Sequence, residues 1–154
     1  RRHNNALEER LVAERQIQKA LKSRGVVRFS LVLMPAQEFL ALQELIPHEE
    51  ARDSGYLTCL DNVQAARLFL ANGNRLGIFF SHQWTSFTAP DPSGQQLAAM
   101  KASVKQLLDR HNCAVENIFV WVDYFSIPQA NDAMKENAIL SLPVYVSLLQ
   151  IFVI

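Results

Sequence analysis

The sequence predicts an α/β fold in which helices flank a parallel sheet. From Asp61 onward, stretches typical of helices alternate with short apolar runs typical of strands. Two of these runs, residues 76–80 and 118–122, are apolar throughout and bounded by turn residues, as in strands buried on both faces. Hydrophobic residues make up 49% of the 154, so the chain can bury a substantial core.

The composition disfavours several classes of partner. Lys plus Arg and Asp plus Glu are both 15, and this balance argues against nucleic acid, whose phosphates require surplus positive charge. No apolar run approaches the roughly 18 residues of a membrane span, and the charged start lacks the apolar core of a signal peptide. Cys59 and Cys113 lie far apart, outside any metal-like spacing. We therefore expect an intracellular protein with no metal site, no nucleic-acid partner and no direct membrane span.

The first part of the chain predicts a helical extension. Residues 5–24 are rich in Glu, Arg, Gln and Lys and carry an imperfect apolar stripe. This helix is either solvated and packed by one edge, or an arm that docks on a partner chain. Gly25 ends it, and residues 26–34 have the composition of a strand.

A boundary between two parts of the chain is expected near residue 55. Residues 35–45 predict a short helix that starts with a proline, and residues 47–56 are polar and predict a loop. This division gives an N-terminal extension or partner arm over 1–55, with one candidate strand, and an α/β domain over 56–154.

Three helices are predicted within the α/β domain. Asp61 and Ser93 each precede a Gln by three residues, the signature of a capping box, so they begin helices that end near Gly73 and Asn112. Asp132 caps the third helix, and Pro143 is expected to kink or restart it. The expected inner face of this third helix consists of Ile139, Leu142, Tyr145 and Leu149.

The two ends of the sequence are those expected of a fragment. The sequence starts at Arg1 rather than Met, and it stops within "QIFVI", which has the composition of a further strand. We therefore expect a fragment whose α/β domain is truncated at the C-terminus.

Polar side chains follow both apolar strands at the point where each strand ends. Ligands of open parallel sheets bind beyond the carboxyl ends of the strands, so these residues form a candidate site. The first cluster contains Ser81, His82, Gln83 and Trp84, and the second contains Asp123, Tyr124, Ser126 and Gln129. They line a ligand pocket or, alternatively, cap the turns that follow the strands.

Individual residues of these clusters have distinct chemical roles to offer. His82 is a candidate general base or hydrogen-bond donor, although a lone histidine is more often structural. Trp84 can stack on an aromatic ligand, whereas Trp121, inside an apolar run, is expected in the core. Asp123 either binds a ribose hydroxyl or caps a turn. Glycine-rich phosphate loops, HExxH, CxxC and GxSxG are all absent, which disfavours ordinary ATPases, Rossmann dehydrogenases, zinc enzymes and serine hydrolases.

Three segments, "FFSHQW", "VWVDYFSIPQ" and "KENAILSLPVY", resemble the heterokaryon-incompatibility domain, a relative of the Toll/interleukin-1-receptor (TIR) fold. The resemblance covers residues 76–154. The matching positions are Ser81, Trp84, Trp121, Asp123, Ile127, Gln129, Glu136, Ile139 and Tyr145. The departures are His82 for Tyr, Thr85 for Gly, Ser126 and Pro128 for Cys and Asn, and Pro143 within the helix. The variant is also similar to uncharacterised algal and protist proteins, which adds no function.

The resemblance implies a TIR-like, flavodoxin-like sheet. It also implies that NAD is a substrate whose nicotinamide–ribose bond is cleaved, and that no cofactor is required. Glu136 matches the glutamate that holds the ribose in catalytic relatives, where a carboxylate stabilises the positive charge that develops on the sugar. Alternatively, Glu136 is an exposed residue that pairs with a nearby lysine. The residues expected to bind the nucleotide are Ser81, His82, Trp84, Asp123, Tyr124 and Gln129.

Three classes of function follow. The domain is an NAD-cleaving or nucleotide-binding signalling domain, a non-catalytic interaction module, or an accessory subunit of a large assembly that uses its N-terminal helix and α/β domain as interaction surfaces. Protein partners or self-assembly are expected in each case. Fold alone does not decide among them.

Overall fold

The computed structural model describes residues 27–81 and 90–154. The helix expected over 5–24 and the predicted site residues His82 and Trp84 lie outside the described residues. Within the described part, five strands form one sheet with helices on both of its faces, which confirms the predicted α/β fold. None of the helices in these ranges has the length and apolar composition that crossing a bilayer requires.

The sheet is mixed rather than parallel throughout. Its strands are β1 (Leu31–Pro35), β2 (Thr58–Leu60), β3 (Leu76–Phe80), β4 (Ile118–Val122) and β5 (Ile151–Val153), in the order β2-β1-β4-β3-β5. Strands β3, β4 and β5 are parallel, whereas β1 runs antiparallel to both β2 and β4. The three strands of the predicted α/β domain are parallel, but the prediction of a parallel sheet was wrong for the sheet as a whole, because the antiparallel strand β1 from the N-terminal segment joins it. Apolar patterns identify a strand without fixing its direction or its place in a sheet.

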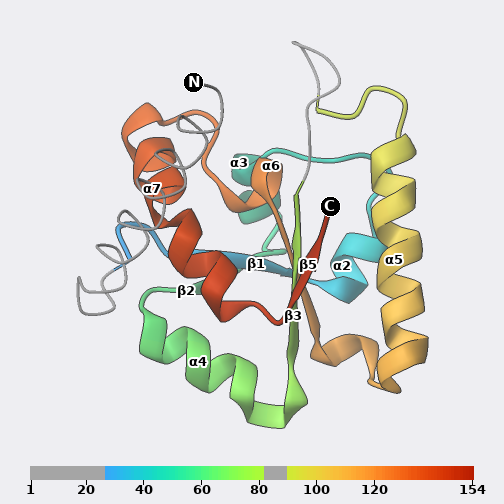
Figure 1. The fold of residues 1–154 in the computed structure, drawn as a ribbon. Coiled ribbons are helices and arrows are strands. Elements are labelled where there is room, and N and C mark those ends of the chain that lie inside the picture. Colours follow the sequence, from blue (N-terminus) through green and yellow to red (C-terminus); the bar gives the residue numbers. More distant parts are fainter. Residues whose placement is uncertain (1–26, 82–89) are drawn as a thin grey trace, which may run out of the picture.

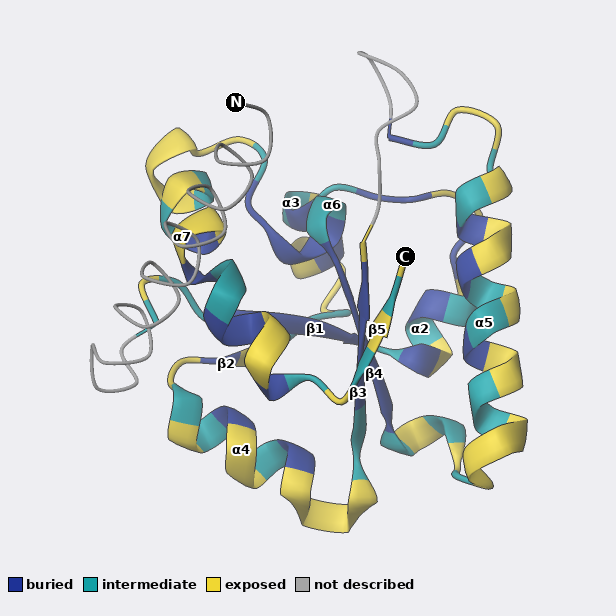
Figure 2. Ribbon diagram, viewed as in Figure 1, coloured by how far each residue is buried: buried dark blue, intermediate teal, exposed yellow. Residues whose placement is uncertain are grey.

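The helices divide between the two faces of the sheet. They are α2 (Ala36–Ala41), α3 (His48–Asp53), α4 (Val63–Ala71), α5 (Gln95–His111), α6 (Asp123–Ser126) and α7 (Asp132–Leu148). In Figure 1, where β3 and β5 are seen nearly edge-on, α2 and α5 lie on one side of these strands and α4 and α7 on the other. Buried residues face the sheet and exposed residues line the outer sides of α4 and α5 (Figure 2).

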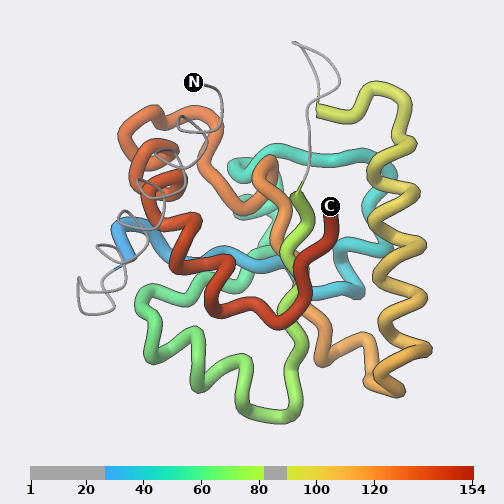
Figure 3. Tube along the Cα trace, in the orientation of Figure 1, coloured from blue at the N-terminus to red at the C-terminus, as the bar shows by residue number. Residues whose placement is uncertain are grey.

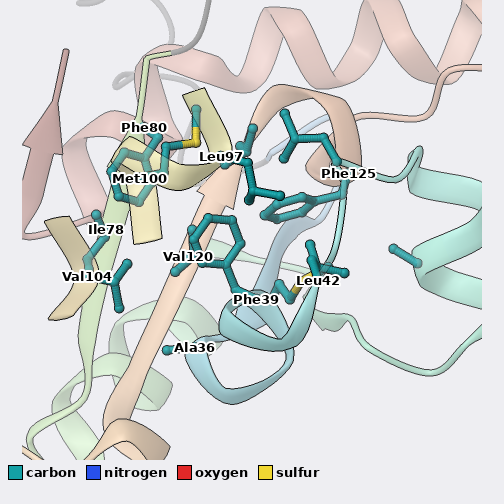
Figure 4. Close-up of a cluster of buried hydrophobic side chains, with 14 of the residues drawn as sticks. Ala36, Phe39, Leu42, Ile78, Phe80, Leu97, Met100, Val104, Val120 and Phe125 are labelled. Atoms are coloured by element: carbon teal, nitrogen blue, oxygen red, sulfur yellow. The ribbon is translucent and has the colours of Figure 1, made fainter. Parts of the chain in front are cut away.

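Each face of the sheet has its own hydrophobic core, because successive side chains of a strand point to opposite sides. Figure 4 shows the core beneath α2 and α5, where Ile78, Phe80 and Val120 of the sheet meet Phe39 and Leu97 of the helices. The opposite core is formed by sheet residues and by α4 and α7. Its members include Phe79, Phe119, Trp121, Ala66, Leu70, Ala138, Tyr145 and Leu148.

The segment before residue 55 packs into the same unit as the rest of the described chain. Strand β1 lies between β2 and β4, and Phe39 of α2 belongs to the core that contains residues of β3, β4 and α5. Packing therefore crosses the boundary expected near residue 55. The prediction of a loop over 47–56 was wrong, because α3 forms there. Its His48 and Ala51 are buried, and this tertiary burial favours a helix that the polar local sequence does not.

The helix caps differ by one or two residues from those predicted. Asn62, not Asp61, caps α4 by accepting the amide N–H of Ala65 at 2.8 Å. Similarly, Asn131 rather than Asp132 caps α7. At α5 the N-cap residue is Gly94, the amide of Leu97 donates to Asp91 Oδ2 at 2.8 Å, and the amide of Gln95 donates to Ser93 Oγ at 3.4 Å. Neighbouring Asn, Asp and Ser residues are equally able caps, so the path of the entering chain selects among them.

Helix α7 runs as one 17-residue helix that contains Pro143. Tyr145 lies on its buried face, as predicted, and its hydroxyl donates to the carbonyl oxygens of Phe29 (2.6 Å) and Ser30 (3.0 Å). Burial raises the pKa of this hydroxyl above its usual range. The expectation that Ile139 faces the core was wrong, because its side chain is 47% exposed. The small residues Ala138 and Ser141 occupy the buried face instead.

Candidate functional site

The chain leaves the adjacent strands β3 and β4 toward opposite faces of the sheet. After β3 the next described helix is α5, on the face of the first core, whereas after β4 the chain passes through α6 to α7 on the other face (Figure 3). In open α/β sheets a crevice forms where neighbouring connections diverge in this way, beyond the carboxyl ends of the strands. The topology therefore places a binding crevice at the ends of β3 and β4.

A cavity of about 430 Å³ lies at this edge, between the ends of β3 and β4 and helix α7. We call it the β3–β4 cavity. Its lining combines polar groups with apolar walls. The polar residues are Ser81, Asp123, Gln129 and Lys135, and the apolar residues include Phe79, Trp121, Ile127, Ile139 and Leu142.

The structure brings together three of the residues that the sequence singled out as nucleotide-binding. Ser81, Asp123 and Gln129 all line the β3–β4 cavity. Tyr124 lies at the same edge of the sheet but lines a different cavity. Glu136, the predicted catalytic residue, is exposed on α7 and is not among the residues that line either cavity.

Lys135 is a cavity residue that the sequence reasoning missed. It lies in the first turn of α7, and its Nζ approaches Gln129 Oε1 at 3.3 Å. The amide nitrogen of Gln129 in turn donates to the carbonyl oxygens of Ile127 (2.7 Å) and Tyr124 (3.2 Å). Gln129 therefore folds back on its own loop and presents its amide oxygen to Lys135. The sequence did hold a signal for Lys135: Gln129 comes just before a predicted helix at the edge of the sheet, and Lys135 lies in the first turn of that helix.

Glu49 of α3 fixes the loop that carries Gln129. Its Oε1 accepts the backbone N–H groups of Gln129 (2.8 Å) and Ala130 (2.9 Å). Partial burial opposes ionisation of Glu49, but these two hydrogen bonds and the charge of His48 outweigh it, so the pKa of Glu49 is lowered. No sequence signal linked Glu49 to this loop, because the contact spans 80 residues.

Stacked aromatic rings form the wall of the cavity next to the sheet. Trp121 stacks on Phe79 with ring centroids 4.2 Å apart and planes inclined by 7°. Phe79 stacks on Phe152 of β5 at 5.0 Å. Trp121 is 2% exposed, which confirms its predicted place in the core. Its indole nitrogen Nε1 is buried and has no hydrogen-bond partner in the described part of the chain.

A second cavity, of about 500 Å³, opens near α3 and the start of α5. We call it the acidic hollow, because its charged lining residues are Glu44, Glu50 and Asp91. Tyr124 also lines it. Burial raises the pKa of the Tyr124 hydroxyl, and the negative charges of Glu50, Glu49 and Glu44 raise it further.

Across residues 27–81 and 90–154, His, Cys, Asp and Glu side chains form no group of three or more that could hold a metal ion. Comparison of the chain with models of known protein families, with curated proteins and with solved structures found no match. The similarity to heterokaryon-incompatibility and TIR domains therefore stays a prediction from the motifs.

Proposed function

We propose that this chain is a TIR-like signalling domain with a flavodoxin-like arrangement of its parallel strands, and that it binds an NAD-type nucleotide in the β3–β4 cavity. The observation that supports this function is the cavity itself, at the point where the connections of β3 and β4 diverge. Its volume of about 430 Å³ lies within the usual range of about 300–1,000 Å³ for small-molecule pockets.

The lining residues offer the groups that such a ligand requires. The carboxylate of Asp123 can accept hydrogen bonds from ribose hydroxyls, and the hydroxyl of Ser81 can donate or accept. The ammonium of Lys135 can pair with a phosphate oxygen in a charge-assisted hydrogen bond. The apolar side chains of Ile139 and Leu142 provide a surface for a planar base.

Binding is tested by titrating the full chain with NAD in a calorimeter, beside two matched variants. Ile139 and Leu140 are adjacent on α7 and both 47% exposed, but only Ile139 lines the cavity. Ile139→Glu replaces an apolar surface for the base with a charged side chain in the same cavity as an anionic ligand, and it should weaken NAD binding by about 100-fold. Leu140→Glu should leave binding unchanged. Equal effects of the two variants, or no binding by the wild type, would contradict the proposal.

Cleavage of NAD is a separate step of the proposal, in which Glu136, exposed on α7 outside the lining of the β3–β4 cavity, would have to reach the ribose to stabilise its developing charge. The measurement is NAD consumption by the wild type, by Glu136→Gln and by Asp132→Asn, a second exposed carboxylate of α7. Loss of consumption in Glu136→Gln alone supports catalysis by Glu136. Binding without consumption in the wild type would leave a nucleotide-binding domain that does not cleave.

Self-assembly is a second candidate function, favoured by apolar side chains exposed on α7. They are Met134, Ile139, Leu140 and Val146, each at least 40% exposed. Light scattering of the full chain across a concentration series measures the assembly state. Leu140→Glu should reduce any self-association without changing NAD binding, and a monomer at all concentrations would remove this candidate.

A further inference from the structure

The side-chain amide of Gln129 is held by hydrogen bonds within the protein. Its nitrogen Nε2 carries two hydrogens and lies within hydrogen-bond distance of three backbone carbonyl oxygens, those of Ile127 (2.7 Å), Tyr124 (3.2 Å) and Asp123 (3.4 Å). Its oxygen Oε1 lies 3.3 Å from Nζ of Lys135. The donor capacity of this amide is therefore used within the protein, although Gln129 lines the β3–β4 cavity.

The backbone of Gln129 is held as well. Glu49 Oε1 accepts its N–H at 2.8 Å and the N–H of Ala130 at 2.9 Å, so a residue of α3 fixes the loop that precedes α7. Both the backbone and the side chain of Gln129 are thus hydrogen-bonded to other parts of the fold. An acceptor that is fixed in this way can in turn fix the group that donates to it.

Gln129 provides Lys135 with a neutral acceptor. The ammonium group of a lysine is carried by a flexible four-carbon side chain, and ordering that chain costs conformational entropy. The hydrogen bond to Gln129 offsets part of this cost before a ligand arrives. Because the amide oxygen is neutral, it holds the ammonium without cancelling its positive charge, which a carboxylate in the same place would do.

The β3–β4 cavity contains both a positive and a negative group. Among the described residues that line it, Lys135 carries an ammonium and Asp123 a carboxylate. Their formal charges cancel, so the net charge of this lining does not by itself favour an anionic ligand. The position of the ammonium then matters for a phosphate, because a charge-assisted hydrogen bond depends on distance and direction.

We propose that Gln129 is a positioning residue that makes the β3–β4 cavity selective for a phosphate-bearing ligand by holding the ammonium of Lys135. The proposal rests on the proposed function and deepens it, since it identifies the residue that sets the preference for phosphate. Gln129 acts through Lys135 and not by direct contact with the nucleotide. A nucleoside without phosphate makes no use of the positioned ammonium, so the cavity binds it less tightly than the nucleotide.

A double-mutant cycle separates this role from a merely structural one. Calorimetric titration measures NAD affinity for the wild-type chain, Gln129→Met, Lys135→Met and the double variant. Lys135→Met should weaken binding about tenfold, the value of one charge-assisted hydrogen bond, and Gln129→Met about fivefold. The double variant should bind no more weakly than Lys135→Met, because Gln129 then has no ammonium to position. Independent effects would multiply to about fiftyfold, and that result would overturn the proposal.

Adenosine serves as the ligand without phosphate. Its affinity, measured in the same way, should be equal in all four proteins. A loss of adenosine binding as large as the loss of NAD binding would show that Gln129 supports the cavity as a whole rather than the phosphate contact.

Nuclear magnetic resonance of the ligand-free wild type tests the positioning without any change at residue 129. The Lys135 ammonium signal, assigned by its absence in Lys135→Arg, should show restricted motion. The matched control is the ammonium of Lys105, which is exposed on α5. Equal mobility of the two ammonium groups would overturn the proposal even if Gln129→Met did not fold.

The outcomes distinguish this inference from the proposed function. If NAD binds but the effects of the two substitutions multiply, or Lys135 moves as freely as Lys105, the inference fails while the proposed function stands. If NAD does not bind the wild type, the proposed function fails and this inference fails with it.

Discussion

The two cavities at the carboxyl edge of the sheet are similar in size but differ in how their polar groups are satisfied. Among the described residues that line the β3–β4 cavity, of about 430 Å³, Lys135 carries a positive charge and Asp123 a carboxylate, and Lys135 donates to the neutral amide of Gln129. The acidic hollow, of about 500 Å³, is rich in acceptors, and its Asp91 already accepts the amide of Leu97 at the start of α5. A phosphate-bearing ligand complements the first cavity and is repelled by the second.

The comparison teaches that volume does not identify a binding site. The larger cavity collects carboxylates that cap a helix or face water, so its lining is explained without a ligand. The smaller one includes the ammonium group of Lys135 in its lining, so it can balance part of the charge of a phosphate. The charges that line a cavity are therefore better evidence for its ligand than its volume.

Two adjacent glutamates of α3 give the strongest test of this difference, because Glu49 supports the β3–β4 cavity whereas Glu50 lines the acidic hollow. Glu49→Ala removes the acceptor of two backbone N–H groups and should lower the free energy of unfolding by about 2 kcal/mol. Glu50→Ala should change it by less than about 0.5 kcal/mol. Urea denaturation measures both, and equal losses would show that Glu49 does not hold the loop.

The next largest effect is expected on the buried face of α7, where Tyr145 anchors this helix to the chain preceding β1. Tyr145→Phe leaves the carbonyls of Phe29 and Ser30 without this donor and should cost about 1 kcal/mol in unfolding free energy. The control is Tyr56→Phe, since the Tyr56 hydroxyl makes no hydrogen bond within the described residues. An equal loss in the control would show that the hydrogen bonds of the Tyr145 hydroxyl are not what stabilises the fold.

Acid should weaken the support of the β3–β4 cavity through Glu49. The pKa of Glu49 is lowered by folding, so its carboxylate stabilises the folded state above its unfolded pKa of about 4.3 and this contribution is lost as the pH falls through the folded pKa. The stability advantage of the wild type over Glu49→Gln should therefore shrink between about pH 5 and about pH 3. An advantage that is constant over this interval would mean that the charge of Glu49 contributes nothing.

The smallest effect is expected from reversing a charge in the acidic hollow. Glu50→Lys introduces a cation that would strengthen nucleotide binding if the phosphates lay in that cavity. We expect NAD affinity to change less than about twofold, because an exposed charge outside the binding cavity is largely screened. A large gain in affinity, measured by the same calorimetric titration, would move the site to the acidic hollow.

The sequence predicted much of the candidate site. It did not predict the contacts between residues that are far apart in the chain. Ser81, Asp123 and Gln129 were found because polar residues directly after two apolar strands must share one edge of a sheet. Glu49 could not be found, because its contact with Gln129 spans 80 residues. Ile139 was assigned to the core because the stripe of α7 was read one residue away from its true buried face.

The sequence by itself determined the α/β class, the two central strands and the polar edge beyond them, because side-chain periodicity and turn residues are local properties. Only the tertiary structure decided the antiparallel direction of β1, the helix at His48–Asp53 and the joining of Lys135 and Trp121 in one cavity. These features depend on strand pairing and on burial between distant segments. Such contacts are set by the packing of the whole domain rather than by any one stretch of the chain.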